Sequence, residues 1–454
     1  MTANLTLTEL ERLVASGEID TVLTCVPDMQ GRLMGKRFLA AHFVNGGHEE
    51  THGCNYLLAT DIEMTTVQGY KSTSWAAGYG DYVHRPDLST LRRAAWLPGT
   101  AMVMCDVLDH HAHEEVPHAP RTVLRRQVER ARALGLEPMM ATELEFFLFE
   151  ESFEALRDAR YRAPTPVVRY NNDYGLFGSM KEEAVMRPLR NALHASGVPV
   201  ENTKGEAEAG QEEINVRYAD AMATADHHAI VKQATKEVAW AAGRSVTFMA
   251  KYATDRAGSS SHIHQSLWRD GSNAFREEGA EHGMSPLMRS YLAGLLAHAG
   301  EVTAFLAPYV NSYKRFTVGM FAPTKAVWST DNRTAGFRVC GADTGGVRVE
   351  CRVGGADLNP YLALAAQLAA GLAGVEQGLE LESEMAGDMY QAEGARLIPR
   401  NLREAADLLD GSAMLREAMG TEVIDHYVHA ARWEVAEADR AVTDHDLLRG
   451  FERF

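Results

Sequence analysis

Met140-Ala-Thr-Glu-Leu-Glu-Phe-Phe-Leu-Phe149 is the stretch of this 454-residue sequence from which the fold can be worked out. Its aromatic and branched residues predict a buried strand. Side chains on a strand alternate between faces, so Glu143 and Glu145 point the same way and Leu144 points the other way. Two ionised carboxylates among apolar neighbours repel each other and lose hydration, and divalent metal ions can supply the counter-charge. The pair therefore predicts a metal site on one face of a sheet.

Three further predicted strands carry apolar residues on one face and charged or polar residues on the other. The polar faces hold His262, His264 and Ser266; Arg348, Glu350 and Arg352; and Glu213 and Asn215. We expect the apolar faces to pack on a core and the polar faces to border a shared cavity.

The chemistry of these polar faces favours a metal-phosphate enzyme. Carboxylates with a minority of histidines suit Mg²⁺ or Mn²⁺ better than a structural zinc site. Arginines beside such carboxylates suit a polyphosphate, which indicates phosphoryl transfer from a nucleotide. The sequence has no GxxxxGK[ST] and no GxGxxG motif, so a metal-stabilised or non-catalytic binding protein stays an alternative at this point.

Composition limits the possible partners and the compartment. The net charge of −17 argues against nucleic acid and anionic membranes as partners. Five cysteines without CxxC spacing, and an N-terminus without a signal-peptide pattern, predict a cytoplasmic protein with reduced thiols. The longest apolar run, Leu362 to Val375, is interrupted by Gln367 and falls short of the ~18 residues of a membrane span.

Two domains are expected. A hairpin over residues 20–38 and a strand over 101–105 form a small β-rich domain, residues 1–108. The His-rich stretch Asp109–Glu115 reads as a solvated linker rather than a metal tract. Residues 109–454 form the second domain, an α+β unit of antiparallel strands with helices on one side. Its expected helices are 120–134, 182–196, 219–242 and 360–376, and its further strands are 212–218, 246–252, 261–268 and 347–353.

The same residues resemble the type I glutamine synthetase superfamily over nearly the whole chain. The matching blocks are Thr142–Phe147, Gly205–Ile214, His262–Ser266, Asn311–Arg315, Asn332–Arg338, Arg348–Arg352 and Asn359–Tyr361. The resemblance implies an N-terminal β-grasp domain and a catalytic domain with a funnel-like antiparallel sheet. It also implies a homo-oligomer, a ring hexamer or double-ring dodecamer with each active site at a subunit junction.

The resemblance implies a role for each motif position. The metal nearest glutamate would be held by Glu145, Glu206 and Glu213, with Glu208 as an alternative to Glu206. The metal that holds the ATP phosphates would be held by Glu143, His262 and Glu350. ATP would be contacted by His264, Ser266, Arg348 and Arg338. The phosphoryl group in flight would be stabilised by Arg333 and Arg338, and glutamate would be held by Arg315, Arg352 and the backbone at Gly258.

The implied reaction uses ATP to convert glutamate to γ-glutamyl phosphate, which an amine then attacks. Ammonia-using members carry an acidic residue where this chain has Phe321, and an Asp loop where it has His52–Tyr56. A bare ammonium ion needs charged or well-oriented oxygen partners, so their loss favours an amine that bears carbon. His52 is a candidate for the base that deprotonates this amine.

The substituted segments resemble γ-glutamylethanolamide synthetases, the glutamate–ethanolamine ligases. The likeness is carried by Gly53–Leu58, Phe248–Tyr252, Phe321–Thr324 and Asp331–Thr334. It implies ligation of glutamate to ethanolamine, in ethanolamine utilisation and nitrogen metabolism. The alternatives are a γ-glutamylpolyamine synthetase, an ammonia-using glutamine synthetase, and a non-catalytic nucleotide or metabolite sensor on the same fold. Tyr390 lies near a position that some members modify, and we expect it to be unmodified surface.

Overall fold

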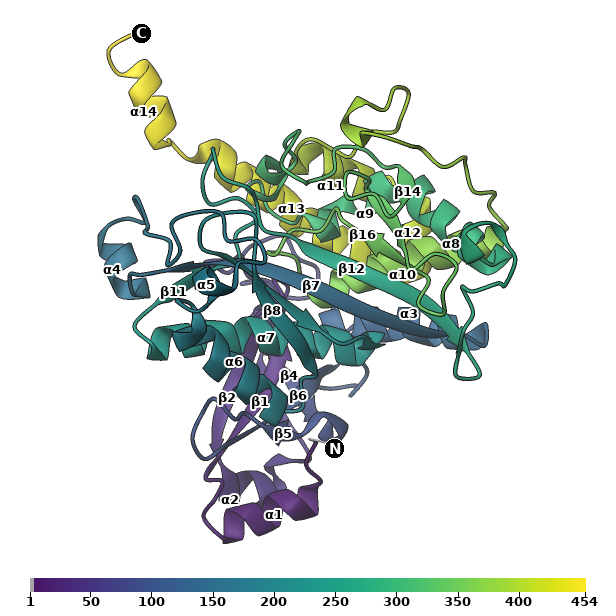
Figure 1. The fold of residues 1–454 in the computed structure, drawn as a ribbon. Coiled ribbons are helices and arrows are strands. Elements are labelled where there is room, and N and C mark those ends of the chain that lie inside the picture. Colours follow the sequence, from purple (N-terminus) through teal and green to yellow (C-terminus); the bar gives the residue numbers. More distant parts are fainter. Residues whose placement is uncertain (1–3) are drawn as a thin grey trace.

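The N-terminal part of the chain forms a mixed sheet. The computed structural model describes residues 4–454, and this sheet lies at the purple end of the ribbon (Figure 1). Its strand order is β2-β1-β6-β4-β3, with the short β5 beside β6. The bounds are β1 Thr21–Pro27, β2 Leu33–Leu39, β3 Thr51–Cys54, β4 Asp81–Pro86, β5 Arg92–Arg93 and β6 Thr100–Asp109, with helices α1 Leu7–Ala15 and α2 Ala40–His42. Strands β1 and β2 pair antiparallel, which confirms the predicted hairpin.

A larger sheet forms the centre of the molecule, where β7 and β12 run side by side (Figure 1). Its order is β14-β15-β16-β12-β7-β9-β8, and only β14 and β15 pair in parallel along this path. The bounds are β7 Glu137–Phe149, β8 Val200–Gly205, β9 Gln211–Val216, β10 Ala219–Asp220, β11 Ser245–Thr247, β12 Ser261–Arg269, β13 Ser272–Asn273, β14 Trp328–Thr330, β15 Phe337–Cys340 and β16 Arg348–Cys351. The α+β class and the antiparallel character of the second domain are confirmed.

Helices cover the apolar face of this sheet. Leu144, Ile214 and Ile263 on its strands belong to the same buried cluster as α10, Pro360–Gln377. The Asn359 side chain caps α10 by accepting from the backbone N–H of Tyr361, and Gly378 ends the helix at φ 60°. The other long helices are α3 Pro120–Ala133, α6 Glu183–Ala195, α7 Ala221–Ala241, α8 Pro286–Ala297 and α13 Thr421–Arg440. The shorter ones are α4 Phe153–Asp158, α5 Leu176–Ser179, α9 Ala299–Leu306, α11 Leu402–Asp410, α12 Ala413–Met419 and α14 Asp444–Gly450.

One predicted strand is largely wrong. The only strand here is the three-residue β11, Ser245–Thr247, so just two of residues 246–252 are in a strand. Beyond it the backbone N–H of Lys251 donates to the Asn311 side chain at 3.1 Å, and Asn311 donates back to the Lys251 carbonyl at 2.8 Å. These side-chain bonds replace a strand ladder, so an apolar run that resembles a strand leaves the sheet.

The stretch after β6 is a turn that stays close to the sheet. The Asp109 carboxylate accepts from the N–H groups of His111 and Ala112, and a single bridge pairs Leu108 with Glu115. The domain boundary after residue 108 remains a prediction.

All five cysteines are free, as expected. Within residues 4–454, none of the helices has the length and apolar character that crossing a membrane requires.

Candidate active site

The polar face of the large sheet borders a cavity of about 510 Å³. Its wall contains most of the side chains that the sequence singled out. They are Glu143, Glu145, Glu206, Glu213, His262, Gly258, Arg315, Phe321, Arg333, Arg338 and Arg352. The sixth predicted metal ligand, Glu350, is buried behind this wall with 1% of its surface exposed.

Strand register brings the acidic groups together. Across β7 and β9, Glu145 lies opposite Glu213, and across β7 and β12, Glu143 lies opposite His262. Ligand atoms of Glu145, Glu206 and Glu213 lie within 4.8 Å of one another, as do those of Glu143, Glu145 and His262. Two neighbouring groups of donors therefore share Glu145.

The structure separates Glu206 from its alternative, Glu208. The Glu208 carboxylate accepts from Arg256 at 2.7 Å and from the Ala257 N–H at 3.0 Å, so it is engaged outside the cluster. Glu145 is oriented by the Ser260 N–H at 2.7 Å and by the Gln211 amide at 3.1 Å. Glu206, rather than Glu208, is the carboxylate that completes the group around Glu145.

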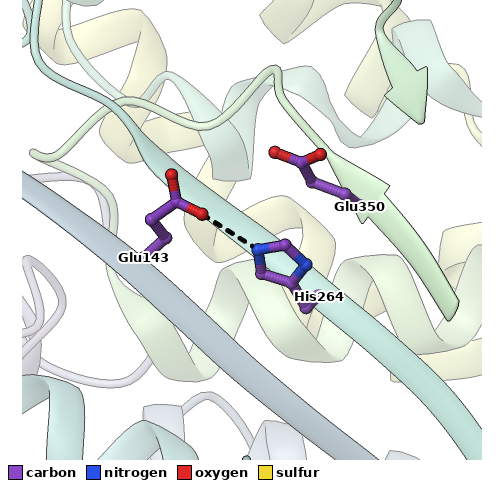
Figure 2. A group of neighbouring side chains, drawn as sticks. All are labelled: Glu143, His264 and Glu350. Atoms are coloured by element: carbon purple, nitrogen blue, oxygen red, sulfur yellow. Dashed lines mark hydrogen bonds and ion pairs between the residues drawn. The ribbon is translucent and has the colours of Figure 1, made fainter. Parts of the chain in front are cut away.

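A third donor group contains a histidine that the resemblance placed against ATP. Figure 2 shows Glu143, His264 and Glu350, whose ligand atoms lie within 4.8 Å of one another. The Arg348 Nε donates to His264 Nδ1 at 3.2 Å, which leaves His264 Nε2 to donate to Glu143 at 3.1 Å. Arg348 thereby fixes the tautomer of a histidine that could bind a metal only after giving up this proton.

Glu350 joins the carboxylates to the arginines. Its two oxygens accept from Arg352 Nη1 at 2.6 Å and from Arg338 Nη1 at 3.1 Å. Burial alone would raise the pKa of Glu350, but Arg352, His262 and His264 outweigh it and lower the pKa to about 2. Glu350 is therefore ionised throughout the physiological range.

The pKa of Glu213 moves in the opposite direction. Burial, followed by the negative charges of Glu143 and Glu206, raises the pKa of Glu213 to about 10. Burial alone would raise the pKa of Glu143, but interactions with His262 and His264 hold this pKa well below its ordinary value. The cluster thus contains more carboxylates than its own cations neutralise, which is the charge pattern expected of a divalent-metal site.

This pattern predicts that metal binding releases a proton. Because Glu213 is protonated at neutral pH in the metal-free protein, a metal that uses its carboxylate must displace that proton. We expect the apparent affinity for Mn²⁺ to rise from about pH 6 to 8, by up to about tenfold per pH unit. Calorimetry in buffers of different ionisation enthalpy would count the released protons, and Glu213→Gln should remove the release. A pH-independent affinity would contradict the prediction.

The floor of the cavity is built around Arg315 and Gly258. Arg315 is 3% exposed and donates to the carbonyls of Val353 at 3.0 Å and Arg352 at 3.1 Å. A Cβ on Gly258 would come within 2.4 Å of the Ala250 carbonyl oxygen and 2.7 Å of the Arg315 side chain. Only glycine allows the backbone at position 258 to pack this closely against the buried guanidinium.

A second cavity, of about 330 Å³, adjoins the first. It is lined by His264, Ser266 and Arg348, which are the residues expected to contact ATP. Glu143 lines both cavities. The two cavities therefore meet at Glu143 of strand β7.

Of the two residues predicted for the amine pocket, one lines the first cavity and the other does not. Phe321 lines the first cavity and is 58% exposed. His52 does not line either cavity of its own chain; its Nε2 lies 3.6 Å from Glu50, and its ring lies 5.5 Å from that of His110. A contribution of His52 to this site would have to come from a second copy of the chain.

Sequence reasoning missed several residues of this wall, among them Asp173, Tyr174 and Lys204. Lys204 Nζ lies 3.3 Å from the Asp173 carboxylate, pairs with Glu206, and sits 4.4 Å from the centre of the Tyr174 ring. Asp173 is therefore a carboxylate in the cavity, which we did not expect, and it shares the single positive charge of Lys204 with Glu206. Strand alternation gave no signal for Lys204, because β8 ends at Gly205 and Glu206 lies beyond it.

Tyr390 is not the open surface residue that the sequence predicted. It is half-buried, and its hydroxyl donates to the Ala322 carbonyl at 3.1 Å. Burial raises the pKa of Tyr390. The nearby positive charges of Arg352 and Arg315 lower this pKa, but burial outweighs them. The residue lies between the Phe321 loop and two arginines of the cavity.

Comparisons with known proteins agree with this arrangement. The family model "Glutamine synthetase, catalytic domain" matches residues 117–449. The chain is 48% identical to the γ-glutamylethanolamide synthetase of Streptomyces coelicolor, over 98% of this chain and 95% of that protein. It is 34% identical to the glutamate–isopropylamine ligase of a Pseudomonas species, over 95% of each chain. The solved structure of apo GmaS superposes with a TM-score of 0.86 and 27% identity, covering 98% of this chain and all of that one. The chain therefore belongs to the glutamine synthetase family.

Proposed function

We propose that this protein is an ATP-dependent ligase that joins the γ-carboxylate of glutamate to ethanolamine through γ-glutamyl phosphate. The observation that carries this proposal is the convergence of carboxylates, histidines and arginines on two adjoining cavities. The S. coelicolor relative is named for the same product, and the Pseudomonas relative is named for a glutamate–amine ligation. The intact donor set and these relatives disfavour a non-catalytic sensor.

The donor set fits two or more Mg²⁺ or Mn²⁺ ions per subunit. Carboxylate oxygens with a minority of imidazole nitrogens are the ligands that these ions accept, and a divalent cation would take the place of the proton that Glu213 holds in the metal-free protein. Glu145, Glu206 and Glu213 would hold one ion, and Glu143, His262 and Glu350 another, with His264 beside it. Bound there, the ions would supply charge neutralisation for phosphoryl and acyl transfer.

The chain's own residues then have distinct tasks. His264, Ser266 and Arg348 bind ATP in the second cavity. Arg315, Arg352 and the backbone at Gly258 hold glutamate, because buried guanidinium groups suit a carboxylate. Arg333 and Arg338 balance the charge of the phosphoryl group during transfer.

The amine side of the cavity supports a small amine that bears carbon. Phe321 stands on this wall where a carboxylate could otherwise lie, and the Asp173 carboxylate is 3.3 Å from Lys204 Nζ. At the Phe321 position ammonia would lack a charged oxygen partner, and the second ammonium of a polyamine would lack one too. Both remain rival substrates for the assay below.

The test is an amine screen that follows phosphate release, with mass detection of the γ-glutamyl product. We expect phosphate release to require glutamate and ethanolamine together. Turnover that is faster with putrescine or spermidine would favour the polyamine ligase, and robust turnover with ammonia alone would favour a glutamine synthetase. ATP binding without turnover by any amine would favour a sensor.

Phe321→Glu is expected to change amine preference. A carboxylate at this wall would take space from the ethanolamine carbons and provide an oxygen partner for ammonium, so kcat/KM for ethanolamine should fall by at least roughly tenfold relative to that for ammonia. Phosphate release with each amine measures the ratio. Phe177→Glu is the matched control, because Phe177 is 71% exposed and does not line the cavity. An unchanged ratio would place Phe321 away from the amine.

We further propose that the protein is a cytoplasmic homo-oligomer, a ring hexamer or double-ring dodecamer with active sites at subunit junctions. His52 lies outside both cavities of its own chain, as expected if a neighbour uses it. Helix α14 stands away from the body of the molecule (Figure 1), and Leu448, Phe451 and Phe454 at this end are largely exposed. Light scattering would measure the assembly, and a fully active monomer would contradict it.

A further inference from the structure

A segment late in the chain supports the loop that carries Phe321 and Arg333. We call residues 387–398 the buttress segment. Ala326 N–H donates to the Arg396 carbonyl at 2.8 Å, and Ile398 N–H donates to the Thr324 carbonyl at 3.1 Å. Lys325 Nζ also donates to the Tyr390 carbonyl at 2.9 Å. The buttress segment is therefore bonded along one side of the loop.

The same segment continues to the phosphoryl side of the loop. Asn332 Nδ2 donates to the Gly387 carbonyl at 2.8 Å, and the Met389 N–H donates to Thr334 Oγ1 at 3.1 Å. Met389 is 1% exposed and packs with Val327 and Ala335. These contacts flank Arg333, whose carbonyl accepts from Arg352 Nε at 3.1 Å. The buttress segment thus forms hydrogen bonds near both ends of residues 321–334.

Tyr390 makes the side-chain contact closest to the amine wall. Its hydroxyl donates to the carbonyl of Ala322, the residue directly after Phe321. Phe321 has φ 55°, in the left-handed region that residues other than glycine rarely adopt. Such a conformation persists only where surrounding structure holds it, and the Tyr390 hydroxyl is the nearest side-chain group that holds this backbone.

We propose that Tyr390 is a positioning residue for amine selection: its bond to the Ala322 carbonyl fixes the Phe321 ring at the amine wall. This inference rests on the proposed function, because it concerns the second half of that reaction. Without the bond, the left-handed turn at Phe321 relaxes and the ring no longer presents one surface to the incoming amine. Binding of ATP, in the second cavity, is unaffected.

The test compares Tyr390→Phe with the unaltered protein. Losing one hydrogen bond that orders a loop should raise KM for ethanolamine by roughly five- to tenfold, with KM for ATP unchanged. The ratio of kcat/KM for ethanolamine to that for ammonia should fall by a similar factor. Tyr161→Phe is the control, because Tyr161 is 61% exposed on the turn after α4.

A double-mutant cycle separates positioning from general stability. If Tyr390 acts through Phe321, Tyr390→Phe should add nothing to the change in amine selectivity that Phe321→Ala already causes. Independent, additive effects on selectivity, or equal changes in the KM of all three substrates, would overturn the proposal. Turnover by the unaltered protein tests the proposed function separately. Should it favour another amine, the same ratios and the same cycle are measured with that amine.

Discussion

Glu350→Gln is expected to reduce ligase turnover by at least roughly 10³-fold and to destabilise the protein as well. The amide keeps the size of the side chain but removes a predicted metal ligand. It also leaves Arg352 and Arg338 without the carboxylate that they share, and their side chains are 6% and 14% exposed. Breaking a buried ion pair on one side destabilises by about 3–5 kcal/mol, because the remaining charge stays out of water.

The loss of stability should depend on pH in a defined direction. A carboxyl whose pKa is lowered by folding stabilises the native state above its unfolded value, about 4.3, and this stabilisation disappears as the pH falls toward the native value. For Glu350 that native value is about 2. Urea unfolding of the metal-free protein should therefore show the largest difference between the two forms near neutral pH and a shrinking difference below about pH 4.

Glu281→Gln is the matched control for this substitution. Its carboxylate is 71% exposed and pairs with Arg289 at 3.3 Å on the surface. Surface pairs contribute little to stability, so turnover and unfolding should both stay unchanged. Comparable losses in the two variants would show that the buried position of Glu350 between two arginines has no special importance.

Arg333→Ala should reduce kcat by roughly 10³-fold while leaving the fold intact. Arg333 lines the cavity, is exposed to solvent, and within residues 4–454 its guanidinium makes no ion pair or hydrogen bond to another protein group. Its charge is therefore free to act on a transferring phosphoryl group, where charge builds up only during the reaction. Since no native contact is lost, the melting temperature should stay the same.

Single-turnover measurements of ADP formation with glutamate and ATP would place this effect on the first half of the reaction. Arg269→Ala, at the exposed end of β12, is the control. An Arg333 variant that forms ADP at the normal rate but couples amine slowly would contradict the assigned role. A variant with a lowered melting temperature would contradict the premise that this side chain has no structural task.

The polar faces of the strands could be predicted because alternation is a local property. Glu143 and Glu145, or His262 and His264, share a face whatever the strand pairs with. Their convergence depends on sheet register, which is not local. His264 reaches Glu350 because β12 pairs with β16 at that position, and Arg338 reaches Glu350 because β15 pairs with β16. The family resemblance, rather than periodicity, supplied this long-range information.

The residues that sequence reasoning misjudged are held by irregular backbone. Asp173 and Tyr174 follow no strand or helix pattern, and their place in the wall depends on the buried Asn172 that packs against Gly175, Gly178 and Gly205. Tyr390 was expected to be unmodified surface because residues 387–392 depart from the motif of the members that modify this position. It is half-buried because the chain returns there across residues 322–334. Contacts of this kind, between irregular segments far apart in the sequence, leave no periodic pattern from which they could be predicted.

Glu143 borders both cavities, and this gives the two a thermodynamic link. A ligand in either cavity that draws this carboxylate into a fixed position lowers the entropic penalty that the next ligand must overcome. Linkage is reciprocal, so nucleotide and amino acid should each tighten the binding of the other by the same factor. Synergism between the substrates is thus expected from the side chains that the two cavities share, Glu143 and Asn215.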